Sequence, residues 1–257
     1  SDSIVMDVRP NITWTWSANE ICAGDTIHFA TQGDSVYVFY INGILDTILG
    51  NGLVYSATGL SNGQQISVGG TAGACVPSPL TVIVNPLPVA PMTCSDPDTT
   101  ICSGEMITFT GSGADKYQFL IDGDTVGGFS FFGTYSTDSL THGQVVNMQA
   151  MSAEGCIGTS PNSYTVSVNP SPTVVLSQSD PDTTICAGDT VIFTAGGANS
   201  YEFFISGASQ GAPGPDSIFT TSALINGAIV TVQGTSGLCT ATSSTIYTYV
   251  VEPMPIV

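Results

Sequence analysis

Residues 96–110, DPDTTICSGEMITFT, return almost unchanged at residues 180–194 as DPDTTICAGDTVIFT, and a weaker copy, SANEICAGDTIHFAT, occupies residues 17–31. Each copy is followed by an aromatic stretch, a corner of the kind Leu-x-Asn/His-Gly, a second cysteine and a closing stretch that ends in proline. A whole unit of more than 80 residues is therefore repeated three times, which indicates a tandem array of like domains.

Within each unit apolar and small polar residues alternate, as in residues 190–194 (TVIFT) and 164–168 (YTVSV). Period-two alternation is typical of strands with one face on a core and one face in water. Clusters of Gly, Asn and Asp interrupt the runs every 8 to 12 residues or so, which is the spacing of a β-sandwich. The sequence therefore predicts an all-β chain of three tandem β-sandwich domains.

Proline-rich stretches close each unit and set the expected domain boundaries. We predict repeat domains at residues 11–86, 87–170 and 171–257, joined by linkers that proline stiffens, and hence an elongated array. Residues 1–10 (SDSIVMDVRP) align with the closing stretch of the second unit (PNSYTVSVNP). They are expected to be the last strand of a preceding repeat or a strand donated to a neighbour; an ordinary first strand is the alternative.

Six of the seven cysteines follow the repeat, and the second cysteine of each unit stands 53, 54 and 53 positions after the first. Equal separations predict one disulfide in each domain, in an oxidising and therefore extracellular setting. There is no C-x-x-C pair and no histidine cluster to suggest zinc. The seventh cysteine stands near the first linker and is expected to be unpaired or to bond another chain. The predicted pairs are Cys22–Cys75, Cys102–Cys156 and Cys186–Cys239, with Cys94 left over.

The charge is strongly lopsided, with 20 acidic residues against 2 basic ones and a formal net charge of −18. Nucleic-acid binding requires a basic face, and docking on anionic lipid requires one too, so neither is expected. No hydrophobic stretch is long enough to span a bilayer as a helix, and no secretion signal stands at Ser1. We expect a mature or excised extracellular chain.

No arrangement of reactive groups points to catalysis. The sequence lacks the H-E-x-x-H, G-x-S-x-G, phosphate-loop and dinucleotide motifs, so no catalytic residue and no cofactor are expected. Calcium is a weak alternative, because two carboxylates flank a proline at the entry to the second and third units: Asp96 and Asp98, then Asp180 and Asp182. A simple Asp-Pro-Asp turn is the preferred interpretation, because two carboxylates fall short of the six to eight oxygen ligands that calcium takes.

Ten of the fifteen aspartates precede a Ser or Thr that is followed by an aliphatic residue, Met or Thr, far more often than composition predicts. Turn chemistry leading into strands is one interpretation. Covalent glycosylation of the hydroxyl is the other. The ten hydroxyl residues are Ser3, Thr26, Ser35, Thr47, Thr99, Thr125, Ser139, Thr183, Thr190 and Ser217.

This pattern resembles the O-glycosylation acceptor that Bacteroidota use on exported proteins. The units, TTICAGDTVIFTA through YEFFISG and LINGAIVTV to YVVEP, resemble the immunoglobulin-like (PKD-type) repeats of large surface proteins of that phylum. The resemblance implies an immunoglobulin-like fold, type IX secretion, and a role in adhesion, gliding or fibre formation.

We therefore expect a non-enzymatic segment of an extracellular surface filament or adhesin, partnered by copies of itself or by neighbouring repeats. A glycan- or surface-binding module and a spacer attached to a secreted enzyme are the alternatives. Trp14 and Trp16 alternate in one strand and are the candidate ligand contacts, although a core or interdomain role suits them too. Asn11 opens a single N-glycosylation sequon, Asn11-Ile12-Thr13, which is a weak signal.

Overall fold

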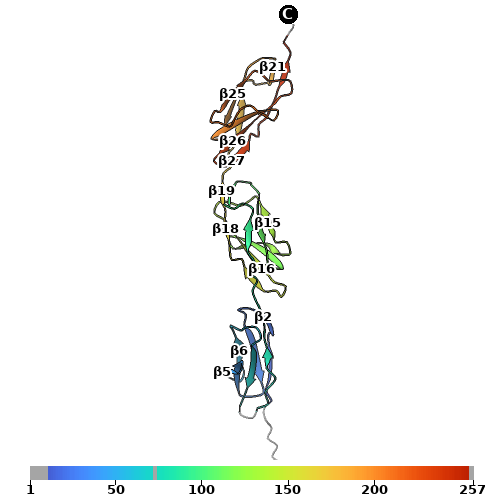
Figure 1. Ribbon diagram of the computed structural model, residues 1–257, viewed down its shortest axis with the longest axis vertical. Coiled ribbons are helices and arrows are strands. Elements are labelled where there is room, and N and C mark those ends of the chain that lie inside the picture. The colour runs from blue at the N-terminus through green and yellow to red at the C-terminus, as the bar shows by residue number, and fades with distance from the viewer. Residues whose placement is uncertain (1–10, 72–73, 255–257) are drawn as a thin grey trace, which may run out of the picture.

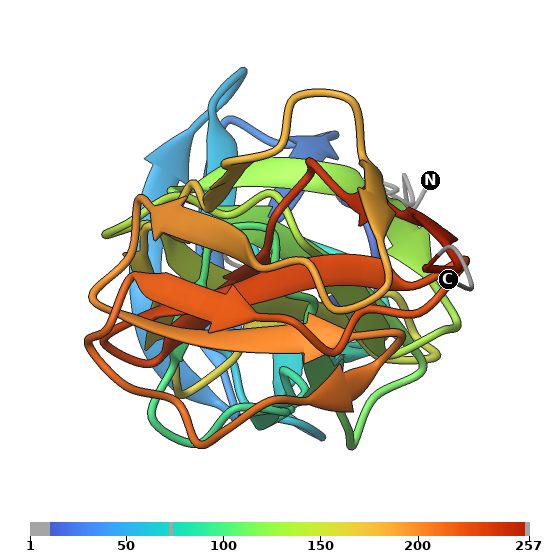
Figure 2. The ribbon, with the colours of Figure 1, turned by 90° about the horizontal axis from the view of Figure 1, so that it is seen from above.

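The computed structural model describes residues 11–71 and 74–254, and these residues form strands and turns only. The strands gather in three bodies that follow one another along a single long axis (Figure 1). Viewed down that axis the bodies lie over one another, so the molecule is narrow in cross-section (Figure 2). We call residues 11–86 repeat 1, residues 87–170 repeat 2 and residues 171–254 repeat 3.

The strands of repeat 1 are β1 (Thr13–Trp16), β2 (Glu20–Cys22), β3 (Ile27–Gln32), β4 (Val36–Ile41), β5 (Ile44–Gly50), β6 (Val54–Ala57), β7 (Gln65–Gly69), β8 (Leu80–Thr81) and β9 (Ile83–Asn85). Those of repeat 2 are β10 (Met92–Cys94), β11 (Thr100–Cys102), β12 (Ile107–Gly111), β13 (Lys116–Ile121), β14 (Asp124–Ser130), β15 (Thr134–Thr137), β16 (Val145–Met151), β17 (Ile157–Thr159), β18 (Tyr164–Thr165) and β19 (Ser167–Asn169). Those of repeat 3 are β20 (Val175–Gln178), β21 (Thr184–Cys186), β22 (Val191–Gly196), β23 (Ser200–Ile205), β24 (Ala208–Ser209), β25 (Ile218–Thr221), β26 (Ile229–Ser236), β27 (Cys239–Thr242), β28 (Tyr247–Thr248) and β29 (Val250–Glu252).

Strand pairing differs in one strand between repeat 1 and the other two repeats. In repeat 1, one sheet has the order β1-β3-β6 and the other β5-β4-β7-β8, and β2 pairs in parallel with β9. Repeat 2 has β10-β12-β15, β14-β13-β16-β17 with β18 also on β16, and the parallel pair β11-β19; repeat 3 has the equivalent strands. The counterpart of β8 is β18, and the described part of repeat 1 has no counterpart of β17. Two antiparallel sheets, with one parallel pair between the second and last strands of each repeat, are an immunoglobulin-like arrangement. The predicted all-β, immunoglobulin-like fold is confirmed.

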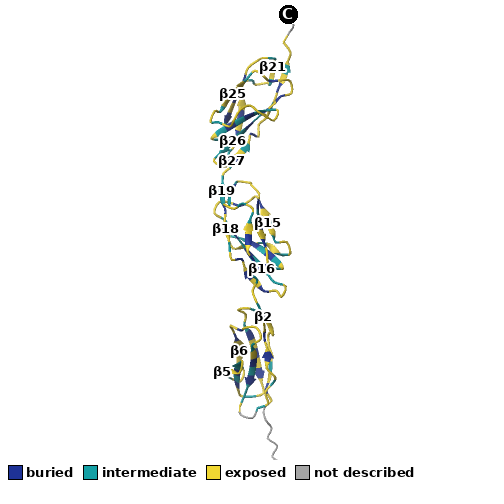
Figure 3. Cartoon of the chain, in the orientation of Figure 1, coloured by how far each residue is buried: buried dark blue, intermediate teal, exposed yellow. Residues whose placement is uncertain are grey.

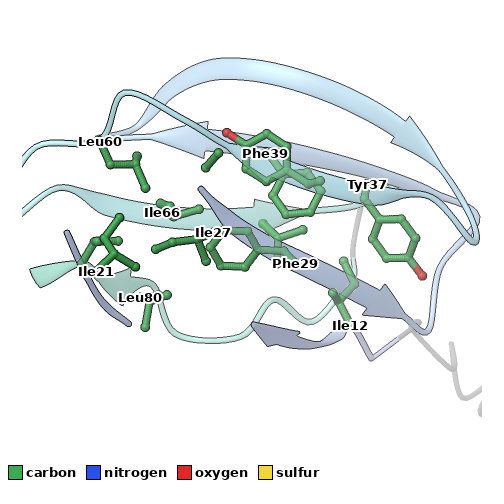
Figure 4. Packing of buried hydrophobic residues seen from close by; sticks show 13 residues of the cluster. Ile12, Ile21, Ile27, Phe29, Tyr37, Phe39, Leu60, Ile66 and Leu80 are labelled. Atoms are coloured by element: carbon green, nitrogen blue, oxygen red, sulfur yellow. The ribbon is translucent and has the colours of Figure 1, made fainter. Parts of the chain in front are cut away.

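Each repeat has a hydrophobic core of its own, built by the alternation seen in the sequence. Strand β3 alternates buried and exposed residues along its whole length, and β22 begins in the same way. The buried hydrophobic residues form three clusters, whose members lie within residues 12–84, 90–168 and 174–251. In repeat 1, Phe29 and Phe39 lie at the centre of the cluster, with Ile27 and Ile66 on one side of them and Tyr37 on the other (Figure 4). Buried residues are thus concentrated inside the repeats (Figure 3).

One tyrosine closes the same loop in every repeat. In repeat 3 the Tyr201 hydroxyl accepts a hydrogen bond from the Ala198 amide (3.0 Å) and donates one to the Ala198 carbonyl (2.7 Å). Tyr117 does the same with Ala114, and Tyr37 with Asp34. A local loop that returns with identical bonding supports the three-fold duplication found in the sequence.

The hairpin after this tyrosine strand also recurs. In repeat 1 it turns at Asn42 and Gly43, both of which have positive φ (50° and 76°). Two consecutive residues of positive φ define the turn that best matches strand twist, and Asn-Gly adopts it at low cost. The Asn42 side chain also accepts a hydrogen bond from the Gln65 amide (2.9 Å), which ties the hairpin to β7.

The predicted boundaries stay predictions, although each core cluster lies inside one predicted domain. The proposed strand of residues 1–10, and with it Ser3, lies outside the described residues. Within residues 11–71 and 74–254 there is no helix of the length and hydropathy needed to cross a membrane.

Candidate functional site: the junctions between repeats

The first cysteine of each repeat occupies one recurring turn at the end where the chain leaves that repeat. Cys186 ends β21 and pairs with Glu252 of the closing strand, just as Cys22 pairs with Asn85 and Cys102 with Asn169. In each case the residue three positions later accepts a hydrogen bond from the cysteine amide through its carboxylate. The acceptors are Asp25 (3.0 Å), Glu105 (2.9 Å) and Asp189 (2.9 Å).

The second cysteine lies at the opposite end, where the chain enters the repeat. The Cys75 carbonyl accepts a hydrogen bond from the Ile12 amide (3.0 Å) at the start of repeat 1. Cys239 Sγ lies 3.9 Å from the carbonyl oxygen of Asn169, the last residue of the strand that closes repeat 2. In repeat 2, Gly158, two residues after Cys156, contacts the Pro88 carbonyl so closely that no side chain would fit there.

The disulfides join neighbouring repeats. Cys22 of repeat 1 is bonded to Cys156 of repeat 2, with the two Cα atoms 5.5 Å apart. Cys102 of repeat 2 is bonded to Cys239 of repeat 3, with the two Cα atoms 5.6 Å apart. The predicted pairs Cys22–Cys75, Cys102–Cys156 and Cys186–Cys239 are therefore wrong, and the prediction of one disulfide within each domain is wrong with them.

Sandwich length explains why the predicted pairs do not form. In repeat 3, Cys186 pairs beside Glu252, beyond the Ile229 end of β26, whereas Cys239 follows the other end of β26 at Ser236. At about 3.3 Å per residue, the eight residues of β26 separate the two cysteines by roughly 25 Å, far beyond the 7 Å limit between bonded Cα atoms. Figure 1 shows β21 and β27 at opposite ends of repeat 3.

Both junctions bring the two halves of the joint together in the same way. A hollow at the first junction is lined by Cys22 and Asp25 of repeat 1 and by Glu154 of repeat 2. The hollow at the second junction is lined by Cys102 and Glu105 of repeat 2 together with Leu238 and Thr240 of repeat 3. Each joint thus consists of the first-cysteine turn of one repeat set against the second-cysteine segment of the next.

Three cysteines in the described ranges carry no bridge. Cys75 and Cys186 are exposed, at the entry end of repeat 1 and the exit end of repeat 3. Cys94 is half-buried in β10, where it packs on the core of repeat 2 rather than lying in a free linker. Burial raises the pKa of the Cys94 thiol, and the backbone amides of Asp96 and Ser95 oppose this shift in part.

The two Asp-Pro-Asp segments form local turns. Asp96 accepts a hydrogen bond from the Asp98 amide (3.2 Å), and Asp98 accepts one from the Thr100 amide (2.8 Å). Asp180 and Asp182 repeat this pattern in repeat 3. No group of three or more His, Cys, Asp and Glu in the described part of the chain is arranged to hold a metal. The weak calcium alternative stays untested.

The candidate glycosylation residues lie at the surface. Four of the nine described positions are exposed, namely Ser35, Thr125, Ser139 and Thr190; the other five, Thr26, Thr47, Thr99, Thr183 and Ser217, are half-buried. Thr99 and Thr183 have positive φ (56° and 60°), which is uncommon for a β-branched residue. The Thr99 hydroxyl also donates to the Asp98 carbonyl (2.7 Å) and the Thr165 carbonyl (2.9 Å), so it already has a structural role. Glycosylation itself stays a prediction.

The two tryptophans of β1 differ in surroundings although their ring centroids are 5.5 Å apart. Trp14 stacks on Phe29 of the core (5.2 Å between centroids), whereas Trp16 is 41% exposed. Asn11 of the sequon is exposed and forms an isolated bridge with Cys75. A role of any of the three in ligand or glycan attachment stays a prediction.

Titratable groups with shifted pKa values are scattered and serve local structure. The Thr71 amide, above all, lowers the pKa of Asp34. Burial, with a hydrogen bond to Asp46 (2.8 Å), raises the pKa of Tyr55. Burial also raises the pKa of Tyr249 to about 12. These groups do not converge on one cleft, as the groups of an active site do.

No protein-family model matches the sequence, and no curated protein sequence matches it. Among solved structures, fibronectin(III)-like modules of CbhA from Clostridium thermocellum align at 15% identity over 62% of this chain and 95% of theirs, with a TM-score of 0.39. A Ca²⁺-stabilised adhesin with which an Antarctic bacterium binds ice aligns at 15% identity over 96% and 75%, with a TM-score of 0.38. A 1.5-MDa bacterial ice-binding adhesin aligns at 16% identity over 96% and 100%, with a TM-score of 0.31. At such low scores the likeness carries no argument, and the fold assignment rests on the strand pairing.

Proposed function

We propose that this chain is a structural segment of an extracellular bacterial surface filament or long adhesin. Its immunoglobulin-like repeats would act as a rod whose joints are covalently fixed. The supporting observation is the pairing of Cys22 with Cys156 and of Cys102 with Cys239, because both bonds connect neighbouring repeats. A second covalent connection beside each peptide linker restricts bending, which is useful in a shaft.

The chemistry of the chain agrees with an extracellular site and a non-enzymatic role. Disulfides persist outside the reducing cytoplasm. A net charge of −18 disfavours nucleic acid and anionic membranes as partners, so the proposed partners are copies of this chain or neighbouring repeats. Membership of the Bacteroidota surface proteins and type IX secretion are part of the proposal, on the strength of the repeat and acceptor patterns.

O-glycans on the Asp-Ser/Thr positions belong to the same proposal. Polar glycans would cover exposed strand faces and edges that otherwise invite association. Mass spectrometry of source-derived protein tests this. Ser35, Thr125 and Thr190 should be occupied most fully, because they are exposed. Thr99 and Thr183 should be occupied least, because their hydroxyls already donate to backbone carbonyls. Unmodified peptides across all ten positions would show the glycan proposal to be wrong.

A bending measurement tests the rod. Negative-stain electron microscopy of the purified chain should give straight three-body particles with a narrow distribution of angles. Replacing both bridges (C22S/C156S with C102S/C239S) should widen that distribution, while C94S, which removes an unbridged thiol, should not. Equal angular distributions with and without the bridges would contradict the structural role of the junctions.

Immunogold microscopy of intact source cells tests the location. Label spaced along thin threads on the cell surface is the expected result. Label confined to the cytoplasm would contradict the proposal.

A binding module is the second candidate, favoured by the exposed Trp16 ring beside Trp14. Aromatic rings offer flat apolar faces on which a sugar can stack. The binding-module hypothesis predicts immunogold label at filament tips or at patches of contact with a substrate. It also predicts that Trp16→Ala abolishes attachment to that substrate. An accessory spacer for a secreted enzyme predicts a catalytic domain encoded in the flanking gene sequence.

A further inference from the structure

Cys186 is held in the turn that carries the bridged cysteines at the two interior junctions. Its amide donates to Asp189, the Asp189 amide donates back to the Cys186 carbonyl (3.0 Å), and Ala187 donates to Glu252 (2.8 Å). The same three hydrogen bonds surround Cys22 and Cys102. Gly188 supplies the positive φ of the turn (92°), as the equivalent glycines do at the other two junctions. The turn at Cys186 is therefore already shaped as the first half of a junction.

Cys75 occupies the position of the second half. Cys156 and Cys239, its counterparts, are 1% and 0% exposed because the preceding repeat covers them, whereas Cys75 is exposed. The local backbone differs in one respect. Cys75 forms an isolated β-bridge with Asn11, whereas Cys156 directly precedes strand β17 and Cys239 begins strand β27. Its place at the entry end of the repeat is the same, with an apolar neighbour, Val76, that is 59% exposed.

We propose that Cys186 of one copy of this chain forms a disulfide with Cys75 of a second copy, which joins the copies head to tail. This bond would join repeat 3 of one molecule to repeat 1 of the next, just as Cys22–Cys156 and Cys102–Cys239 join neighbouring repeats within one molecule. Because the two half-joints differ and stand at opposite ends, the contact is heterologous and continues into a fibre instead of closing as a dimer.

The reaction requires a two-electron oxidant, for which a low-molecular-weight disulfide such as oxidised glutathione serves. The Cys186 thiolate displaces one glutathione thiolate and forms a mixed disulfide. The Cys75 thiolate of the second copy then attacks Sγ of Cys186 and releases the second glutathione. Two protein thiols become one disulfide, and one glutathione disulfide becomes two thiols.

Charge explains why a covalent joint suits this chain. Copies that each carry a net charge of −18 repel one another, and the junction segments add Asp25, Glu105, Glu154 and Asp189 close to the bonding cysteines. A disulfide requires only a small contact area between two copies, and because it is covalent it holds them together against this repulsion once it has formed. Its formation between molecules is favoured by salt, since about 1 M salt shortens the screening length to about 3 Å.

The inference rests on the proposed filament, but its test does not depend on where the protein is located. The purified chain at high concentration and high salt is oxidised with glutathione disulfide, alkylated and separated without reductant. Wild type should give a ladder of multimers that collapses to monomer on reduction. C94S should give the same ladder, because Cys94 is half-buried and takes no part.

Complementary variants decide the direction of the joint. C75S alone and C186S alone should stay monomeric, and their equimolar mixture should give a dimer and no larger species, since each copy then supplies one half of one joint. Mass spectrometry of the dimer should find the peptide containing Cys186 linked to the peptide containing Cys75. A wild-type chain that stays monomeric would overturn the proposal, and so would either single variant forming as much dimer as the mixture.

Failure of the filament proposal is a separate result. Immunogold label in the cytoplasm would contradict the surface role even if the purified chain forms disulfide-linked multimers on oxidation. A missing ladder on a protein that labels surface threads would remove only the covalent head-to-tail joint.

Discussion

The interior of a repeat and the junction between two repeats are built on different principles. The interior is a sandwich core in which residues such as Phe109 and Phe193 are fully buried by strands of their own repeat. At the junction the core clusters do not continue from one repeat to the next, and a disulfide makes the connection. The core therefore depends on hydrophobic burial, and the junction depends on covalent chemistry and redox conditions.

Sheets and core clusters lie within single repeats, whereas the crosslinks run between repeats. Every repeat has a complete set of paired strands without help from its neighbours. The two disulfides, by contrast, run from the first cysteine of one repeat to the second cysteine of the next. Substitutions in the core of a repeat should therefore leave the junction disulfides largely unchanged, and removal of a junction disulfide should leave the cores largely unchanged.

Acid cleavage gives the largest expected effect, since its outcome is all or none. Asp-Pro bonds are the most acid-labile peptide bonds, and the sequence contains two of them, Asp96–Pro97 and Asp180–Pro181. Pairing between repeats predicts that the cleaved chain stays in one covalent piece until it is reduced. Mass spectrometry with and without reductant measures this, and acid also suppresses disulfide exchange because thiolate is absent.

The alternative pairing within repeats makes the opposite prediction. It would release residues 1–96, 97–180 and 181–257 without reductant. The C22S/C156S variant serves as the control, because it should release residues 1–96 before reduction while the bridge Cys102–Cys239 keeps the other two fragments together.

Removing a core aromatic should destabilise one repeat alone. Phe29 is fully buried against Trp14 and Tyr55, so Phe29→Ala should cost repeat 1 about 3–5 kcal/mol. Fluorescence in a denaturant titration reports repeat 1 selectively, since Trp14 and Trp16 are the only tryptophans. Ile44→Ala, at a 73% exposed position of repeat 1, is the control and should change stability by less than about 0.5 kcal/mol. A loss of the interior disulfides in the Phe29 variant would contradict the separation of core and junction.

Two tyrosines of repeat 3 should respond in opposite directions. Tyr201→Phe removes a hydroxyl that bonds both backbone groups of Ala198 and should cost about 1–3 kcal/mol. The Tyr249 hydroxyl is buried without a hydrogen-bond partner, and the equivalent core residue in repeat 2 is Val166. Tyr249→Phe should therefore leave stability unchanged or raise it by up to about 1 kcal/mol. Amide hydrogen exchange resolves repeat 3, and a large loss in Tyr249→Phe would show that the hydroxyl has a partner after all.

The smallest expected effect is a pH dependence confined to repeat 1. Asp34 accepts hydrogen bonds from the amide and the hydroxyl of Thr71 (2.7 and 2.8 Å), and the amide, above all, lowers its pKa below the ordinary value of 3.8. A lowered folded-state pKa gives stability that is present above pH 3.8 and is lost as pH falls through the folded-state value. Asp34→Asn should flatten this acid dependence in tryptophan-monitored unfolding. Glu20→Gln should not, because it removes an equal charge from the same repeat and keeps an acceptor for the Asn85 side chain.

The sequence was sufficient for the fold because the information is local and given three times. Alternation along residues 190–194 predicts a half-buried strand, and β22 alternates buried and exposed residues there. The disulfides were predicted wrongly because separations of 53 or 54 residues repeat along the chain. Pairing within a repeat and pairing shifted by one repeat therefore fit the spacing equally well.

A topological signal for the shifted pairing was nevertheless present. In an immunoglobulin sandwich the turn after the first short strands and the far end of the penultimate long strand lie at opposite ends of the domain. Cys186 falls in the former and Cys239 after the latter, so the assigned fold already excluded their bond. The buried position of Cys94 in β10 required side-chain packing that a linker-like sequence does not reveal.

The shifted bridges also limit how far the molecule can be stretched. Between Cys22 and Cys239 the backbone would extend to roughly 760 Å if every repeat unravelled, at about 3.5 Å per residue. The covalent route through the bridges instead uses only the segment between Cys156 and Cys102, which extends to roughly 190 Å. Even with all three sandwiches pulled apart, the chain would behave as a short tether and not as a long spring.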